Sequence, residues 1–194
     1  QFVTALPDTL HQQGLKLATP LAAPQNVGSR WETGGQDWAA LGQLADEVNI
    51  AMPLDPAAYG DGGLADQILT WAVRQIDRHK LNMLISASAI NRVGDSFVEL
   101  ANEAALSNFG ELAFVQGSET VEPGTAVEVA LSGTASPLEW DGASLTYKYS
   151  YEDSGQTHTV WLANAASLAH RLNLAKKYHL GGAAVTGLGA VADT

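Results

Sequence analysis

The feature of this sequence that most constrains its fold is a repeated order in which a segment of helical period is followed by a short apolar run. The apolar runs are Leu15–Leu21, Val48–Leu54, Leu81–Ser86 and Gly182–Leu188. Apolar residues at helical spacing precede them, at about 2–10, 38–47, 64–79 and 165–178. Such alternation is typical of parallel strands that are buried on both faces of a sheet. The sequence therefore predicts an α/β fold with four parallel strands.

The stretch from about Asn91 to Trp161 departs from this alternation. Val98–Asn108 has a helical pattern. Polar and apolar residues alternate, as in antiparallel strands, at Ala126–Ser132, Thr146–Tyr151 and Thr157–Leu162. Asp153-Ser154-Gly155 supplies a hairpin turn between the last two runs. We therefore predict a small α+β insertion, at about 91–161, within the α/β scaffold.

Composition and charge exclude several classes of function. The net charge is −11 and the 10 Lys and Arg residues form no cluster, so we expect no nucleic acid partner. The chain has no cysteine, which excludes thiol chemistry. The five histidines lack the spacing of a metal site, and no phosphate-binding glycine loop surrounds Gly181-Gly182. We expect neither a metal nor a cofactor, and no membrane span, because the apolar runs are far shorter than the ~20 residues required.

Four parallel strands, each with a helix before it, are compatible with two architectures. One is an open doubly wound sheet. The other is half of an eight-stranded barrel, a fold that needs ~250 residues in total. Periodicity alone does not distinguish between them.

Three stretches resemble the second half of the family 18 glycoside hydrolase barrel. Leu145–Trp161 is similar to the tyrosine-rich hairpin of this family, in particular of its chitinase-like and spore-cortex-type members. Ala165–Gly182 resembles the seventh helix and the lead into the eighth strand. Leu44–Asp55 is similar to the sixth strand, whose signature is Met-x-Tyr-Asp.

The resemblance implies that this chain is α/β and forms the second half of a (β/α)8 TIM barrel, with an α+β insertion after the seventh barrel strand. The fifth to seventh strands would occupy 1–90, the insertion 91–161, and the last helix with the eighth strand 162–194. Half a barrel has two unpaired edges, which invite association. We therefore expect a preceding segment or a partner chain to complete the barrel, and residues 1–194 alone not to be a self-sufficient fold.

The resemblance also implies a particular chemistry. In family 18 enzymes the acetamido group of the substrate is the nucleophile, and the protein supplies one carboxylic acid with supporting aspartates. In the family these acids form an Asp-x-x-Asp-x-Asp-x-Glu motif after the fourth strand, and that spacing does not occur in this sequence. We therefore expect no catalytic residue in this chain; the motif would belong to residues before Gln1.

The other site positions of the family are matched only in part. Met52 and Asp55 fit the sixth-strand signature, but its Tyr is replaced by Leu54, which has no hydroxyl to donate to the acetamido intermediate. The Trp that supports the bound sugar in the eighth strand is replaced by Thr186 or Gly187. These two departures favour a degenerate site.

Six residues are candidates for contact with a substrate: Met52, Asp55, Trp31, Asn91, Arg92 and Thr186. Several have a simpler interpretation. Asp55 fits the role of a strand-end cap, Trp31 can pack on its own loop, and Asn91 with Arg92 can be a polar linker into the insertion.

Three functions therefore remain open. The first is a catalytically silent glycosidase-like module that binds a polysaccharide or peptidoglycan, or that serves as a scaffold in the cell envelope. The second is the distal half of an active hydrolase of β-1,4-linked N-acetylglucosamine polymers. The third is a structural α/β domain without glycan binding. We favour the first, because Leu54 and Thr186 are poor choices for catalysis, and we expect an extracellular or cell-envelope location.

Overall fold

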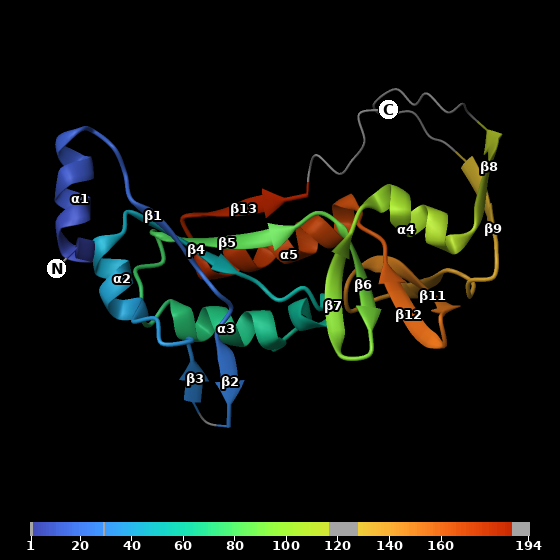
Figure 1. Cartoon of the computed structure of the whole chain (residues 1–194), viewed down its shortest axis with the longest axis horizontal. Helices are drawn as coiled ribbons and strands as arrows, with labels where there is room; N and C mark the ends of the chain where they lie inside the picture. Colours follow the sequence, from blue (N-terminus) through green and yellow to red (C-terminus); the bar gives the residue numbers. More distant parts are fainter. Residues whose placement is uncertain (1, 29, 117–127, 188–194) are drawn as a thin grey trace. The chain divides into compact units, whose positions relative to one another are not determined.

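The computed structural model describes residues 2–28, 30–116 and 128–187. The chain forms two compact units (Figure 1). The first unit consists of Gln1–Ile85 and Leu168–Thr186, and the second of Ser86–Ser167 and Gly187–Thr194. The second unit is therefore inserted into the chain of the first.

The first unit is built around a parallel sheet. Its elements are α1 (Phe2–Gln12), β1 (Ala18–Leu21), β2 (Gln25–Val27), β3 (Arg30–Glu32), α2 (Trp38–Leu44), β4 (Glu47–Ala51), the 3-10 helix η1 (Pro56–Tyr59), α3 (Leu64–Ala72), β5 (Leu81–Ser86), α5 (Ala165–Tyr178) and β13 (Gly182–Thr186). The four-stranded sheet has the order β1-β4-β5-β13, in which β4 is parallel to both β1 and β5. In Figure 1, β5 and β13 run in the same direction. The predicted α/β architecture with strands at the four apolar runs is confirmed; β5 coincides with its run, and the other three strands are shorter than theirs.

The two faces of this sheet differ in burial. Val48 and Ile50 of β4 are fully buried, in one core cluster with Ile68 and Leu69 of α3. Side chains alternate between faces along a strand. The intervening residues of β4, such as Asn49, are only partly buried. One face of the sheet therefore packs on the helices, and the other, which we call the open face, is only partly buried and carries side chains such as Asn49, Ala51 and Leu84.

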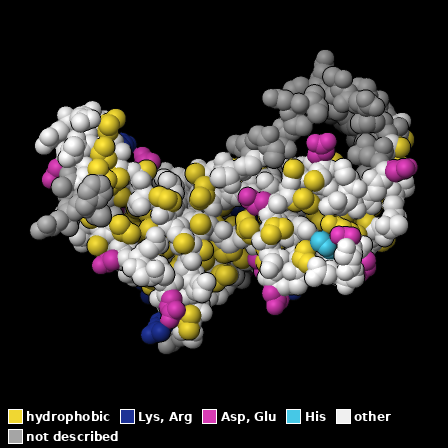
Figure 2. All heavy atoms as spheres, viewed as in Figure 1, with side chains coloured by type: hydrophobic (Ala, Val, Ile, Leu, Met, Phe, Trp, Pro, Cys, Tyr) yellow, Lys and Arg dark blue, Asp and Glu magenta, His cyan; other side chains and the backbone are white. Residues whose placement is uncertain are grey.

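The outer strands of the sheet are also incompletely covered. No residue of β13 is fully buried, whereas the central strand β5 alternates between buried and partly buried positions. Among the described residues, no strand pairs with the outer edge of β1 or of β13. Figure 2 shows hydrophobic side chains on the visible surface of this unit, with Asp and Glu scattered rather than gathered in one patch. Parallel sheets are normally covered on both faces, so this one is exposed to an unusual degree.

Three local features of the first unit differ from the sequence-based prediction. The glycine-containing loop after β1 forms the hairpin β2–β3, and a 3-10 helix follows β4. The helix expected over 64–79 ends at Ala72, and residues 73–80 form turns. Asp77 favours the turn that precedes β5, because its carboxylate accepts a hydrogen bond from the backbone N–H of His79. Ile76 nevertheless remains buried in the core.

The second unit is an antiparallel α+β structure. Its elements are β6 (Ala89–Val93), β7 (Ser96–Leu100), α4 (Asn102–Phe109), β8 (Glu111–Gln116), β9 (Glu128–Ser132), β10 (Glu139–Asp141), β11 (Thr146–Asp153) and β12 (Gln156–Trp161). Five strands form a sheet of order β10-β11-β12-β6-β7. Helix α4 packs on one face, where Phe109 meets Tyr149 edge-on at 5.1 Å and the Tyr149 hydroxyl donates to the carbonyl of Ala105.

The hairpin prediction in this unit is confirmed. Strands β11 and β12 are joined by Ser154 and Gly155, both with positive φ, as a two-residue hairpin turn requires. The predicted helix over 98–108 is wrong at its start, because residues 98–100 belong to β7 and the helix begins at Asn102. Of the strand predicted over 126–132, residues 126 and 127 lie outside the described residues and the rest is β9. In the part of the chain that the structure describes, no helix is both long and apolar enough to cross a membrane.

Candidate functional site

The loop that follows β4 carries two of the predicted site residues, Met52 and Asp55. Met52 extends the strand, since its backbone N–H donates to the carbonyl of Leu84 at 3.0 Å, and its side chain is buried in the core. Asp55 caps η1 by accepting a hydrogen bond from the backbone N–H of Ala57 at 2.9 Å, directly before Pro56. A carboxylate at the cap followed by proline is a strong local signal for a helical start. Asp55 therefore has a structural role, and its carboxylate remains partly exposed.

Tyr59 is a residue of this loop that sequence reasoning missed. Its ring is buried, its hydroxyl donates to the carbonyl of Pro53 at 2.9 Å, and the guanidinium of Arg171 on α5 lies 5.1 Å from the ring centre. Burial raises the pKa of Tyr59 to about 12, so the hydroxyl stays protonated and keeps donating. These contacts hold the loop after β4 against α5. The nearby Leu54 is half-buried and offers no polar group.

Trp31 lies in β3 and packs on other aromatic residues. Its ring stacks on that of Trp71 at 5.9 Å between centroids, and Trp71 in turn contacts Trp38 at 4.9 Å. Trp31 is half-buried by these contacts. Its geometry is that of a packing residue at the edge of the core.

Thr186 ends β13 with an exposed side chain, and its hydroxyl donates to the carbonyl of Ile85 at 3.3 Å. Gly187 follows with φ of 76°, a conformation that suits glycine. Because β4, β5 and β13 lie side by side in one sheet, Thr186 and Asp55 lie at the same end of it, separated by β5. Four of the six predicted site residues thus belong to the first unit.

Asn91 and Arg92 belong to the second unit. The expectation that they form a polar linker after β5 is wrong, because both lie in β6. Asn91 is buried and its side-chain nitrogen lies 3.1 Å from Nδ1 of His158, while Arg92 donates through Nε to the carbonyl of Gly94 at 2.8 Å. Ala89, Ile90 and Asn91 of β6 are all buried, so the strand has no alternating polar pattern that would have indicated it in the sequence.

Two exposed aromatic side chains in the second unit were not selected from the sequence as site residues. Trp140 of β10 and Tyr147 of β11 are 51% and 47% exposed, face each other across the strand pair and meet edge-on at 5.1 Å. Exposed aromatic faces offer a large apolar contact surface with a polar group at the rim. The Tyr147–Tyr149–Tyr151 alternation is visible in the sequence, but which of the three is exposed depends on the position of α4.

The first unit also contains a polar pocket of about 300 Å³ on its helical side. It is lined by Tyr59, Gly60, Asp61, Asp66, His170, Asn173, Leu174 and Lys177. Hydrogen bonding to Lys177 holds the pKa of Asp66 below its usual value, and Asp66 raises the pKa of Lys177 in return. Among the described residues, no group of three or more His, Asp or Glu side chains is arranged to hold a metal ion.

Comparison with known proteins gives a structural match but no sequence match. No protein-family model matches the sequence, and no curated protein matches it. Among solved structures, a chitinase from Chromobacterium violaceum is 25% identical with a TM-score of 0.66, and the match covers 99% of this chain and 56% of the chitinase. The spore cortex-lytic enzyme SleL from Bacillus cereus is 19% identical with a TM-score of 0.62, covering 97% of this chain and 42% of that enzyme.

A plant protein of the same fold matches as well. The GH18 chitinase from Cycas revoluta, solved with (GlcNAc)3, is 12% identical with a TM-score of 0.60, and the match covers 97% of this chain and 58% of that one. This chain therefore spans about half the length of the solved structures that it matches. The resemblance to family 18 glycoside hydrolases is confirmed, and the chain is a mixed α/β protein with the fold of part of a family 18 glycoside hydrolase.

Proposed function

We propose that residues 1–194 form the second half of a family 18 barrel and act as a glycan-binding module that does not itself hydrolyse the glycan. In this proposal β1, β4, β5 and β13 are the fifth to eighth barrel strands, and the insertion of about 91–161 follows the seventh. The supporting observation is a fold match to a chitinase along 99% of this chain, combined with a sequence that has neither the acidic motif nor the aromatic residues of the barrel site.

The open face of the sheet supports the half-barrel arrangement. Asn49 and Asn82 on neighbouring strands share a hydrogen bond of 3.1 Å on this face, and Ala51 and Leu84 lie beside them, all partly exposed. In a closed eight-stranded barrel, residues on this face point into the interior and are buried by side chains from the other strands. A preceding segment of the same protein or a partner chain would supply those strands.

The residues at the carboxyl ends of β4 and β13 support a site without catalytic activity. Leu54 stands where the family has the Tyr that contacts the acetamido intermediate, and Thr186 or Gly187 where it has the Trp under the sugar. Without the acidic motif, this chain lacks the carboxylic acid with which the family protonates the leaving oxygen. The alternative, the distal half of an active hydrolase of β-1,4-linked N-acetylglucosamine polymers, requires its acid to lie before residue 1.

The exposed aromatic pair Trp140 and Tyr147 supports glycan binding. Sugar rings are commonly held by apolar contact with aromatic faces together with a few polar groups. Asp141, next to Trp140, is oriented by a hydrogen bond of 2.7 Å from the indole of Trp161. Burial alone would raise the pKa of Asp141, but this bond and one from the backbone of Ala143 outweigh it and lower the pKa, so the carboxylate is charged at neutral pH.

The test is calorimetric titration with the trimer of β-1,4-linked N-acetylglucosamine, followed by chromatography of the sugar. We expect binding without cleavage, and weaker binding by about three- to tenfold after Trp140→Ala, because an aromatic contact contributes about 0.5–1.5 kcal/mol beyond the area that it buries. Val98→Ala is the matched control, since Val98 is an exposed apolar residue of the same sheet, 48% exposed.

A second pair of variants tests whether the glycan binds at the carboxyl ends of the parallel strands, where Asp55 lies. Asp55→Asn should weaken trimer binding if Asp55 lines the glycan site, while Asp77→Asn should not. Both carboxylates accept a backbone N–H two residues on, at 2.9 and 3.0 Å, but they lie at opposite ends of the sheet. Cleavage by the chain once a preceding segment is joined to it would establish the hydrolase instead. If neither the wild-type chain nor any variant binds the trimer, the chain is a structural domain without a glycan role. Under all three functions, we propose that the protein is extracellular or lies in the cell envelope.

A further inference from the structure

Two loops at the amino end of the sheet of the first unit are tied together through their backbones. The N–H of Gly181, before β13, donates to the carbonyls of Arg78 and Leu81, each at 2.9 Å. A Cβ atom at Gly181 would lie 2.4 Å from the carbonyl oxygen of His79. Only glycine permits this approach. The loop before β5 and the loop before β13 therefore form one fixed surface.

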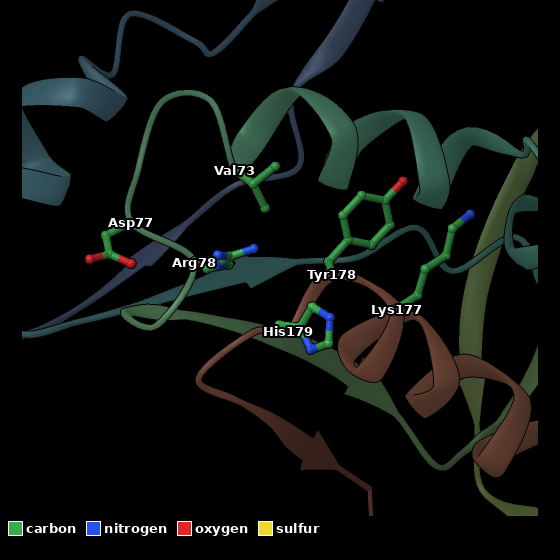
Figure 3. Close-up of a pocket in the computed structure, with 6 residues that line it drawn as sticks. All are labelled: Val73, Asp77, Arg78, Lys177, Tyr178 and His179. Carbon is green, nitrogen blue, oxygen red and sulfur yellow. The ribbon is translucent and has the colours of Figure 1, made fainter.

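A pocket of about 390 Å³ lies between these loops, lined by Val73, Asp77, Arg78, Lys177, Tyr178 and His179 (Figure 3). Lys177 and Tyr178 extend toward α3 in Figure 3, where Lys177 pairs with Asp66 at 2.5 Å. Arg78 and His179 are exposed, and neither makes an ion pair in the described part of the chain. His179 is held in a left-handed conformation, with φ of 51°. Two donors are thus left available in the pocket.

Positive charge is concentrated on these two loops although the chain is acidic. Segments 74–80 and 176–179 contain five of the 10 Lys and Arg residues, in a chain of net charge −11. They are Arg74, Arg78, Lys80, Lys176 and Lys177, accompanied by His79 and His179, with Asp77 as the single acid of these segments. The two segments lie far apart in the sequence, and the fold brings Arg78, Lys177 and His179 to the lining of one pocket.

We propose that this pocket binds an oxyanion, namely a phosphate group, with Arg78 as the principal ligand and His179 beside it. The guanidinium can donate two parallel hydrogen bonds to such a group, which a point charge cannot. Lys176 adds positive charge next to the pocket and attracts an anion from a distance, whereas the charge of Lys177 is compensated by Asp66. The volume of the pocket leaves room for the molecule that carries the phosphate. This site is separate from Asp55 and Thr186, because it lies at the other end of the strands.

The experiment is a calorimetric titration of the whole chain with inorganic phosphate and, separately, with poly(glycerol phosphate). Arg78→Gln should weaken phosphate binding about tenfold or more, because the variant loses both charge-assisted hydrogen bonds of the guanidinium. Arg30→Gln is the matched control, because it removes the same charge from an exposed arginine of the same unit that is paired with Glu32. Raising the salt concentration should weaken binding to both probes.

The outcomes are separable. Equal weakening by both arginine variants would mean that net charge alone attracts the anion, and would overturn the proposal, as would the absence of phosphate binding. Tighter binding of the polymer than of free phosphate, with the same sensitivity to Arg78→Gln, would assign the phosphate to a polymer; equal affinity per phosphate would assign it to a small molecule. Asp55→Asn should leave phosphate binding unchanged, so the result does not depend on the glycan proposal.

Discussion

Gly181 occupies a position in which the fold leaves no space for a side chain. Its two backbone hydrogen bonds and the 2.4 Å that would separate a Cβ from the carbonyl of His79 leave no room for a side chain. We expect Gly181→Ala to lower the free energy of unfolding by about 1–3 kcal/mol, the usual cost of forcing an extra carbon into a packed site. Urea denaturation measures this. In the control Gly60→Ala the new Cβ meets only an ordinary contact of 3.7 Å, and an equal loss there would contradict the explanation.

The sequence could not have indicated this role of Gly181. In the sequence, Gly181 and Gly182 are a glycine pair before an apolar run, which predicts a lead into a strand and no more. The group that makes glycine necessary is the carbonyl of His79, which is far away along the chain. The same holds for Arg78 and His179. Residues that meet only in the folded protein leave no local signal.

At the level of elements, the contact between α3 and α5 closes the helical layer. Lys177 of α5 pairs with Asp66 of α3, and the hydroxyl of Tyr178 donates to the same carboxylate at 2.8 Å. The hydrogen bond to Lys177, aided by that to Tyr178, lowers the pKa of Asp66 against the opposing effect of burial. A carboxyl whose pKa is lowered on folding stabilises the protein above its unfolded pKa of 3.8, and this contribution is lost as pH falls through the folded pKa.

Asp66→Asn should therefore destabilise the protein at pH 7 and have little effect at a pH below the folded pKa of Asp66. Thermal unfolding of both proteins across this range measures the difference. Asp95→Asn, which changes an exposed carboxylate in the turn between β6 and β7, serves as the control. A penalty at Asp66 that persists unchanged into acid would show that the carboxylate acts through something other than its charge.

The sequence was most informative about the long elements and least about the short ones. Helix α5, strand β5 and the β11–β12 hairpin have strong periodicity or a defined turn, and all three were predicted. The hairpin β2–β3 and strand β7 have strands of only three and five residues, too short for a period to stand out. At the candidate site, the sequence identified Asp55, which lies at the end of a strand. It did not identify Tyr59, because the contact that holds the loop after β4 involves Arg171, which is far away in the sequence.

At the scale of the whole molecule, the open face and the free edges of β1 and β13 predict association. We expect residues 1–194 on their own to form species larger than a monomer, measured by light scattering after size-exclusion chromatography. Ala184→Lys places a charge on an edge strand, a common protection against edge pairing, and should reduce association. Ala169→Lys introduces the same charge on an exposed position of α5 and should not. A wild-type chain that is wholly monomeric would argue against the half-barrel arrangement.

The insertion of one unit into the chain of the other has a consequence for how this protein is made. Asp66 and Lys177, which meet in the native state, are separated by 111 positions, so the first unit can be completed only after Lys177 and the strand that follows it have left the ribosome. Closing so long a loop costs conformational entropy, and the cost falls when the intervening residues are already compact. The early folding of residues 86–167 should therefore accelerate the assembly of the first unit, and a mutation confined to that segment can slow the maturation of the first unit.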